Sequence, residues 1–108
     1  MKDDLVYIEH ILSCIDRIQS YTEGLDYDSF LEKQVIQDAI VRQLEIIGEA
    51  TKRVSTEYRD RYPHIPWKVM AGMRDKLIHD YIDVDFRMVW STATEDIPEL
   101  ESLIKELL

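Results

Sequence analysis

The chain has 108 residues, of which 45% are hydrophobic, with three glycines, three prolines and one cysteine. This length allows one core, so we expect a single domain over residues 1–108, and the composition excludes a disordered or turn-rich chain. A net charge of −9 disfavours a nucleic-acid partner at first sight. No apolar run could span a bilayer and the start, MKDDLVYIEH, is unlike a signal peptide, so we expect the cytoplasm and no membrane.

The first predicted helix covers about residues 2–21. Its apolar residues recur at steps of three and four, which places them on one helical stripe. They are Leu5, Ile8, Ile11, Leu12, Ile15 and Ile18. Cys14 borders this stripe and is expected to pack as a small apolar group. Gly24 and the acidic residues after it indicate a break in the helix.

A second, longer helix is predicted to begin at residues 29–32, SFLE, and to end near residue 54. The serine and the glutamate of this segment match a capping box, in which each side chain accepts a backbone N–H of the first turn. Apolar residues cover more than one face, which is typical of a helix that is central in a bundle or packed against a second copy of itself. In a dimer, the surface around Ile40, Leu44 and Ile47 would be buried by the partner.

The next stretch predicts a short helical turn or loop over residues 55–63 and then a third helix. Pro66 suits the first turn of this helix, because its missing N–H would have no intrahelical partner there. Apolar residues at helical spacing follow it. The third helix is expected to end near His79 or Tyr81.

A fourth helix is expected after a cap at Asp83 or Asp85. Pro98 should kink or interrupt it, with Asp96 as a plausible new cap. Together the elements predict an all-α fold, an antiparallel bundle of four main helices with short helical pieces.

Basic residues concentrate between residues 52 and 79. This segment holds seven Lys or Arg and three acids, whereas the rest of the chain holds six basic and nineteen acidic residues. A basic segment on an acidic body can attract a polyanion locally. An exposed segment that is basic by chance explains the count equally well, so charge alone leaves both interpretations open.

The most concentrated group of reactive side chains is GMRDKLIHDY, residues 72–81. Arg74 and His79 lie about 140° apart on an ideal helix, so they would not touch as neighbours but could converge on one groove. A histidine can withdraw the proton from a ribose 2′-hydroxyl, and an arginine can stabilise the charge that develops on the phosphate. RNA supplies its own nucleophile, so we expect no metal and no cofactor, and DNA, which lacks that hydroxyl, should be spared.

The same two side chains also have a structural interpretation. Either could interact with a helix C-terminus, or pair with Asp75 or Asp80. The sequence has no glycine-rich phosphate loop, no cysteine pair and no two-histidine zinc motif. Its three histidines are far apart along the chain, so they could bind a metal only through folding or assembly.

Residues 65–90, IPWKVMAGMRDKLIHDYIDVDFRMVW, resemble the signature segment of HepT-like toxins in the HEPN superfamily. Residues 37–54, QDAIVRQLEIIGEATKRV, resemble the central helix of that family, and the first helix and the IPEL near the end also fit. The family motif is an arginine, four residues, a histidine, one residue and a tyrosine. Here it is RDKLIHDY, from Arg74 to Tyr81, with no departure.

The resemblance implies a HEPN-like fold in which Arg74 and His79 are the ribonuclease pair. It also implies a homodimer in which two protomers bring their motifs together across the interface. It further implies that a nucleotidyltransferase antitoxin transfers AMP onto Tyr81, where a bulky anion would obstruct the groove and repel RNA. Three neighbouring residues are expected to support the site through polar or phosphate contacts. They are Asp75, Lys76 and Asp80, and Arg53 and Arg61 are further candidates for phosphate contacts, although each of them could equally be a solvated surface cation.

The leading hypothesis is therefore a metal-independent endoribonuclease toxin of a type II or type VII-like toxin–antitoxin system. Its substrate would be transfer RNA or messenger RNA, the usual classes for the family. One alternative is a non-catalytic helical adaptor that binds the nucleotidyltransferase. Another is a nucleotide-binding sensor, because an arginine and a histidine also suit the phosphate of a mononucleotide.

Overall fold

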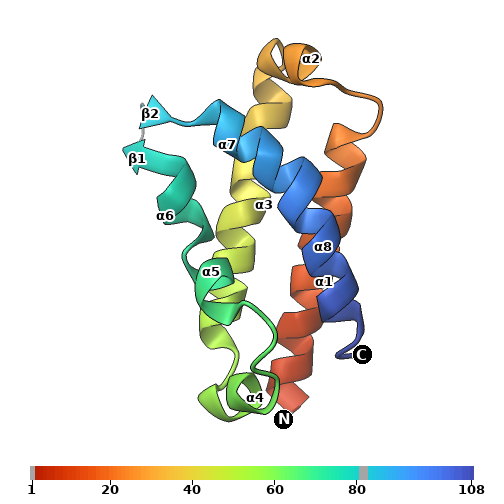
Figure 1. The fold of residues 1–108 in the computed structure, drawn as a ribbon, viewed down its shortest axis with the longest axis vertical. Helices are drawn as coiled ribbons and strands as arrows, with labels where there is room; N and C mark the ends of the chain where they lie inside the picture. The colour runs from red at the N-terminus through yellow and green to blue at the C-terminus, as the bar shows by residue number, and fades with distance from the viewer. Residues whose placement is uncertain (1, 81–82) are drawn as a thin grey trace.

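The computed structural model describes residues 2–80 and 83–108, and the side chains of these residues except at positions 2, 76 and 78–80. Most of this is helix, which confirms the predicted all-α class (Figure 1). The elements in chain order are α1 (Lys2–Thr22), α2 (Tyr27–Leu31), α3 (Gln34–Arg53), α4 (Thr56–Arg61), α5 (Trp67–Ala71), α6 (Met73–Leu77), β1 (Ile78–Asp80), β2 (Asp83–Val84), α7 (Phe86–Ser91), the π-helix η1 (Thr92–Asp96) and α8 (Ile97–Lys105).

Three long helical segments lie side by side: α1, α3, and the continuous run of α7, η1 and α8 (Figure 1). The core lies between them, and its aliphatic residues follow the predicted stripes. Ile40, Leu44 and Ile47 of α3 are fully buried in this core. The expectation that a partner protomer would cover them is wrong, because other helices of the same chain already do.

Helix α3 does not begin at the predicted capping box. Ser29 lies inside the short helix α2, where its backbone N–H donates to Asp26 Oδ1 at 2.8 Å. Asp26, three residues earlier, is therefore the N-cap of α2, whereas α3 begins after Lys33, which makes no capping hydrogen bond through its side chain. At the corner between α2 and α3, Gln37 Nε2 donates to the carbonyl of Phe30 at 2.9 Å. This bond satisfies a carbonyl at the end of α2 and fixes the turn into α3.

The segment predicted as a third main helix is instead two short helices followed by a hairpin. Gly72 separates α5 from α6, and α6 ends at Leu77. The carbonyl of Leu77 accepts the N–H of Asp85 at 2.9 Å, so a residue beyond the hairpin takes this acceptor. The chain then forms β1, which pairs antiparallel with β2. The helix ends two residues before His79, and the backbone of His79 lies in a strand.

The last long helix passes through Pro98 without an interruption. In η1 the N–H of Ile97 donates to the carbonyl of Thr92, five residues earlier, which widens the helix by one residue. The wider turn accommodates a proline, which lacks an N–H and would clash with the carbonyl four residues before it in a regular helix. Asp96 therefore lies inside a continuous helix and makes no capping hydrogen bond. Asp85 caps α7 as predicted.

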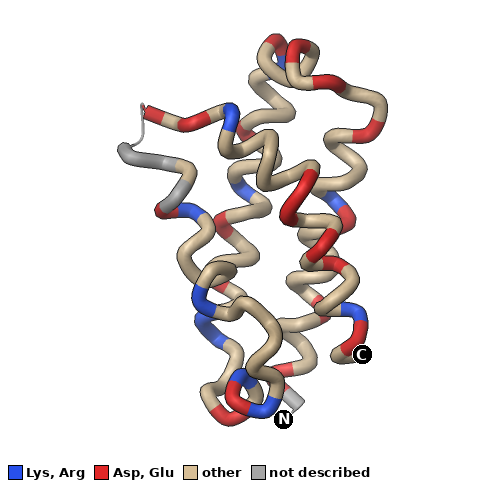
Figure 2. The backbone as a smooth tube through the Cα atoms, viewed as in Figure 1, with Lys and Arg blue, Asp and Glu red and all other residues tan. Residues whose placement is uncertain are grey.

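Charge is distributed unevenly over these elements (Figure 2). Lys and Arg concentrate at the C-terminal end of α3 and on α4 and α5, whereas Asp and Glu dominate α2 and the run from η1 into α8. The basic segment 52–79 runs from the end of α3 through α4 and α5 into α6, and its α5 part shares a pocket with Glu99 and Leu100 of α8. Within residues 2–80 and 83–108, none of the helices has the length and hydropathy needed to cross a bilayer.

A buried carboxylate ties the start of α1 to α4. Asp4 is 2% exposed and accepts two hydrogen bonds from Ser55, one from the backbone N–H at 2.7 Å and one from the hydroxyl at 2.8 Å. Ser55 is the N-cap of α4, and its Oγ accepts the N–H of Tyr58 at 3.2 Å. Burial raises the pKa of Asp4, but the hydrogen bonds from Ser55 together outweigh it, so the pKa lies below its ordinary value of 3.8.

We expect Asp4→Asn to lower the free energy of unfolding at neutral pH by on the order of 1 kcal/mol. Because the pKa is lower in the folded state, the carboxylate contributes fully above its unfolded-state pKa and loses this contribution as pH falls through the folded value. Urea unfolding between about pH 5 and about pH 2 should show the wild-type advantage shrinking towards zero. Asp3→Asn, at an exposed neighbour, is the control. If the difference in free energy of unfolding between the wild type and Asp4→Asn stayed constant with pH, the charge of Asp4 would not be what stabilises the fold.

Candidate functional site

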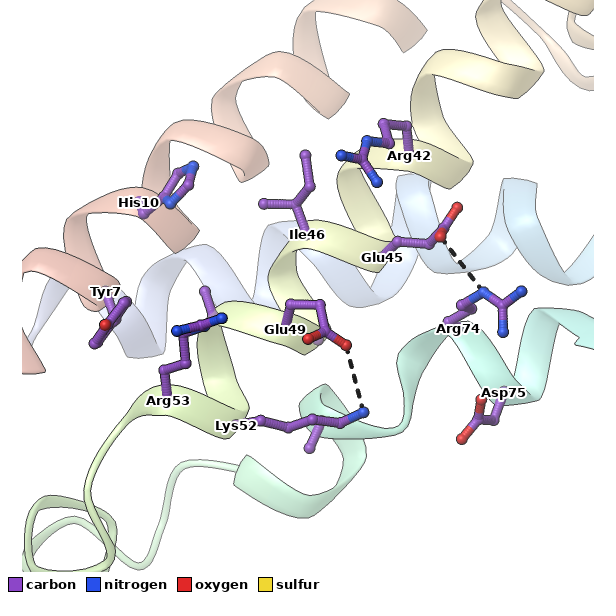
Figure 3. Close-up of a pocket in the computed structure, with 13 residues that line it drawn as sticks. Tyr7, His10, Arg42, Glu45, Ile46, Glu49, Lys52, Arg53, Arg74 and Asp75 are labelled. Carbon is purple, nitrogen blue, oxygen red and sulfur yellow. Dashed lines mark ion pairs between the residues drawn. The ribbon is translucent and has the colours of Figure 1, made fainter.

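A groove of about 450 Å³ lies between α1, α3 and the start of α6 (Figure 3). Four cations and three carboxylates line it, a balance towards positive charge in a chain whose net charge is −9. These residues are Arg42, Glu45, Glu49, Lys52, Arg53, Arg74 and Asp75. Most of them come from one helix, α3, and the last two come from α6. The groove therefore brings the predicted catalytic arginine next to cations from a distant part of the sequence.

Arg74 stands on the α6 wall of this groove with its side chain 53% exposed. Its Nε lies 3.4 Å from Oε2 of Glu45, which is half-buried on α3. This contact engages the Nε edge of the guanidinium and leaves the terminal nitrogens turned away from Glu45 (Figure 3). Two parallel N–H groups suit a phosphate. An ion pair this exposed adds at most about 1 kcal/mol of stability, so its main consequence is the orientation of Arg74.

The remaining predicted site residues are only partly described. Asp75 is exposed and lines the groove beside Arg74. Four others lie outside the described residues, namely the side chains of Lys76, His79 and Asp80 and the whole of Tyr81. The backbone leads directly from α6 into β1, so His79 follows the groove wall closely in the chain. The pairing of Arg74 with His79 stays a prediction.

Several groove residues are not among those that the sequence predicts. Tyr7 and His10 belong to α1, and Arg42 belongs to the acidic part of the chain, outside the basic segment. The spacing of Arg42 and Arg53 does predict that both lie on one face of α3, because a separation of eleven residues is close to three helical turns. Nothing in the sequence, however, indicates that α1 and α6 border that face.

The cysteine and the potential metal ligands of the chain were the other candidates for reactive groups. Cys14 is 2% exposed in the core, as predicted. Burial raises the pKa of its thiol against a weaker opposing effect of Arg17, so the thiol is uncharged near neutral pH. Among the described side chains, no three His, Cys, Asp or Glu residues are grouped so that they could hold a metal ion.

Known proteins match this chain over nearly its whole length. The family model described as Ribonuclease HepT-like matches residues 11–107. A "Putative RNase" of Methanocaldococcus jannaschii is 46% identical over 110 residues, which cover 98% of this chain and 95% of that protein. The "Probable ribonuclease HepT" of Thermococcus cleftensis is 44% identical over 101 residues, 94% of this chain and 92% of that protein. No solved structure matches the chain.

The family match covers α1 after residue 10 and all of α3 and α6, so it includes the α3 and α6 walls of the groove but not Tyr7 and His10, and it continues to the end of α8. A "Putative RNase" of Caldanaerobacter subterraneus, 44% identical, aligns with all of this chain and 96% of its own length. The resemblance drawn from the motif is thereby confirmed, as is the prediction of a ribonuclease at the level of the family. The chain belongs to the Ribonuclease HepT-like family.

Proposed function

We propose that this protein is a metal-independent endoribonuclease toxin that cleaves RNA with Arg74 and His79. The observation that carries the proposal is the position of Arg74, whose half-exposed guanidinium lies on the wall of a groove rich in cations. Glu45 engages only the Nε side of that guanidinium. Membership of a ribonuclease family supports RNA as the substrate, and the motif supplies a histidine five residues after the arginine.

In the proposed reaction, His79 takes the proton from a ribose 2′-hydroxyl. The 2′-oxygen then forms a bond to the adjacent phosphorus, and the bond to the 5′-oxygen of the next nucleotide breaks. His79, which became protonated in the first step, then donates a proton to the leaving 5′-oxygen. Arg74 donates to the equatorial oxygens, on which negative charge accumulates in the transition state. The products are a 2′,3′-cyclic phosphate and a 5′-hydroxyl.

The active form in this proposal is a homodimer in which both motifs border a shared cleft. One small helical domain offers limited concave surface, and a two-fold interface adds to it. The rate of cleavage per protomer should therefore fall when the protein is diluted below the concentration at which it dimerises. Sedimentation at the same concentrations gives the oligomeric state, and an unchanged rate in a monomer would contradict the composite site.

The reaction itself is tested with purified protein and a short RNA in an excess of chelator. We expect cleavage, a cyclic phosphate detected by mass spectrometry, and no cleavage when one 2′-deoxynucleotide replaces the residue before the scissile bond. The double variant Arg74→Ala/His79→Ala should retain the helical circular-dichroism spectrum and lose the activity. Cleavage of the deoxy-substituted RNA at the same bond would contradict attack by the 2′-oxygen.

Neutralisation by a nucleotidyltransferase is the regulatory part of the proposal, with Tyr81 as the acceptor. The tyrosine oxygen attacks the α-phosphorus of ATP, pyrophosphate leaves, and the protein carries AMP two residues from His79. The added phosphodiester is anionic and bulky, so we expect cleavage to stop. The measurement is intact mass and RNA cleavage after incubation with the transferase and ATP. Tyr81→Phe should cleave RNA, gain no mass and escape neutralisation, whereas AMP mapped to another residue would contradict this assignment.

A further inference from the structure

Arg42 and Arg53 are two of the three groove cations that the proposed reaction does not use, and the third, Lys52, is paired with Glu49. Both arginines are exposed and both belong to α3. They are eleven residues apart, which corresponds to about three turns and roughly 16 Å along the helix axis. They therefore stand on one face of α3, near opposite ends of the groove (Figure 3).

The carboxylates between these two arginines are already paired with other cations. Glu45 contacts Arg74 at 3.4 Å, and Glu49 contacts the Nζ of Lys52 at 3.6 Å. Among the described side chains no carboxylate forms an ion pair with Arg42 or Arg53, although the protein is strongly acidic. The positive charge of both arginines is thus left available to a ligand in the groove.

Aromatic side chains border the same space on the α1 side. Tyr7 and His10 are one helical turn apart, and both line the groove opposite the α6 wall. Aromatic rings beside arginines are the usual means by which proteins hold unpaired bases while cations follow the phosphates. Because the two guanidinium groups stand apart in the groove (Figure 3), one mononucleotide phosphate would not meet both of them where they lie. A strand with several phosphates could reach both.

We propose that the groove is a binding track for single-stranded RNA, in which Arg42 and Arg53 hold two backbone phosphates other than the one bound by Arg74. This inference rests on the proposed ribonuclease function for the identity of the ligand. The α3 arginines fix the path and register of the strand, and Tyr7 and His10 face its bases. The contacts to phosphate carry no sequence information, so the track sets where the strand lies rather than which sequence is cut.

The test is the binding of the whole protein to a labelled single-stranded 2′-O-methyl RNA, which has no free 2′-hydroxyl and is not cleaved. Arg42→Ala and Arg53→Ala should each raise the Kd about tenfold, the effect of one lost charge-assisted contact. Each should also reduce the slope of log Kd against log salt by about 0.7, because one fewer phosphate is neutralised. Arg42→Lys and Arg53→Lys keep the charge and should keep the slope.

Arg61→Ala is the matched control, because it removes an exposed arginine of α4 that does not line the groove. Its Kd and salt slope should stay at the wild-type values. The track is excluded if the α3 variants bind like the wild type, or if Arg61→Ala weakens binding as much as they do. These outcomes are separate from those of the ribonuclease test. If the wild type binds this RNA through the α3 arginines but cleaves no natural RNA, only the proposed nuclease activity is contradicted. If the wild type cleaves RNA while the α3 variants bind RNA normally, only the proposed track is contradicted.

Discussion

Replacing Arg74 by alanine is expected to lower kcat for RNA cleavage about 10²- to 10³-fold, the cost of removing one preorganised donor to transition-state charge. The fold should be unaffected, because the side chain is 53% exposed and its ion pair with Glu45 is a surface contact. Single-turnover cleavage at saturating RNA measures the rate, and urea unfolding measures the stability of the same preparation.

Two further variants separate the roles of charge and geometry at this position. Arg74→Lys keeps the charge but loses the planar fork, so its rate should fall between those of the wild type and Arg74→Ala. Glu45→Gln removes the partner that engages Nε and should reduce kcat by less than Arg74→Ala does, with little change in stability. An Arg74→Ala rate within twofold of the wild type would remove this arginine from the mechanism, and the groove would then need another explanation.

The long helices were predictable because their signal is repeated many times. Apolar residues at steps of three and four run through α1 and α3, and the observed α1 ends at Thr22, one residue beyond the prediction. The boundaries set by a single residue were less reliable. The SFLE segment satisfies a capping-box pattern, but Asp26 is the N-cap of the short helix α2, which begins earlier. When two nearby side chains can each accept a backbone N–H at a helix start, the sequence pattern alone does not show which of them does so.

Contacts between distant residues account for what the sequence did not predict. The stretch from Met73 to His79 has no proline or glycine to end a helix, and α6 ends because the N–H of Asp85 reaches the carbonyl of Leu77. The same limit applies to the site. The motif gives Arg74 and His79 directly, whereas Arg42 joins the groove only because α3 packs between α1 and α6.

The fit between α3 and α5 is tight at one glycine, and this makes a second strong prediction. A Cβ on Gly48 would lie 3.2 Å from the carbonyl oxygen of Ala71 and 3.5 Å from that of Met70. Both are backbone atoms of α5, so they can yield only if the helix moves. A Cβ on Gly72, in contrast, would meet its nearest atom, the carbonyl oxygen of Lys68, at an ordinary 3.6 Å.

We therefore expect Gly48→Val to lower the free energy of unfolding by about 2 kcal/mol, because overpacking outweighs the small gain in helix propensity. Gly72→Ala should leave it unchanged or raise it by about 0.5 kcal/mol, since Gly72 has φ −96°, which any L-residue adopts. Urea unfolding measures both variants. Because α5 leads through Gly72 into α6, displacing α5 also moves Arg74 relative to Glu45, so folded Gly48→Val should cleave RNA more slowly than folded Gly72→Ala. If Gly48→Val matched the wild type in both stability and rate, the close approach of α3 and α5 would not be what positions the arginine.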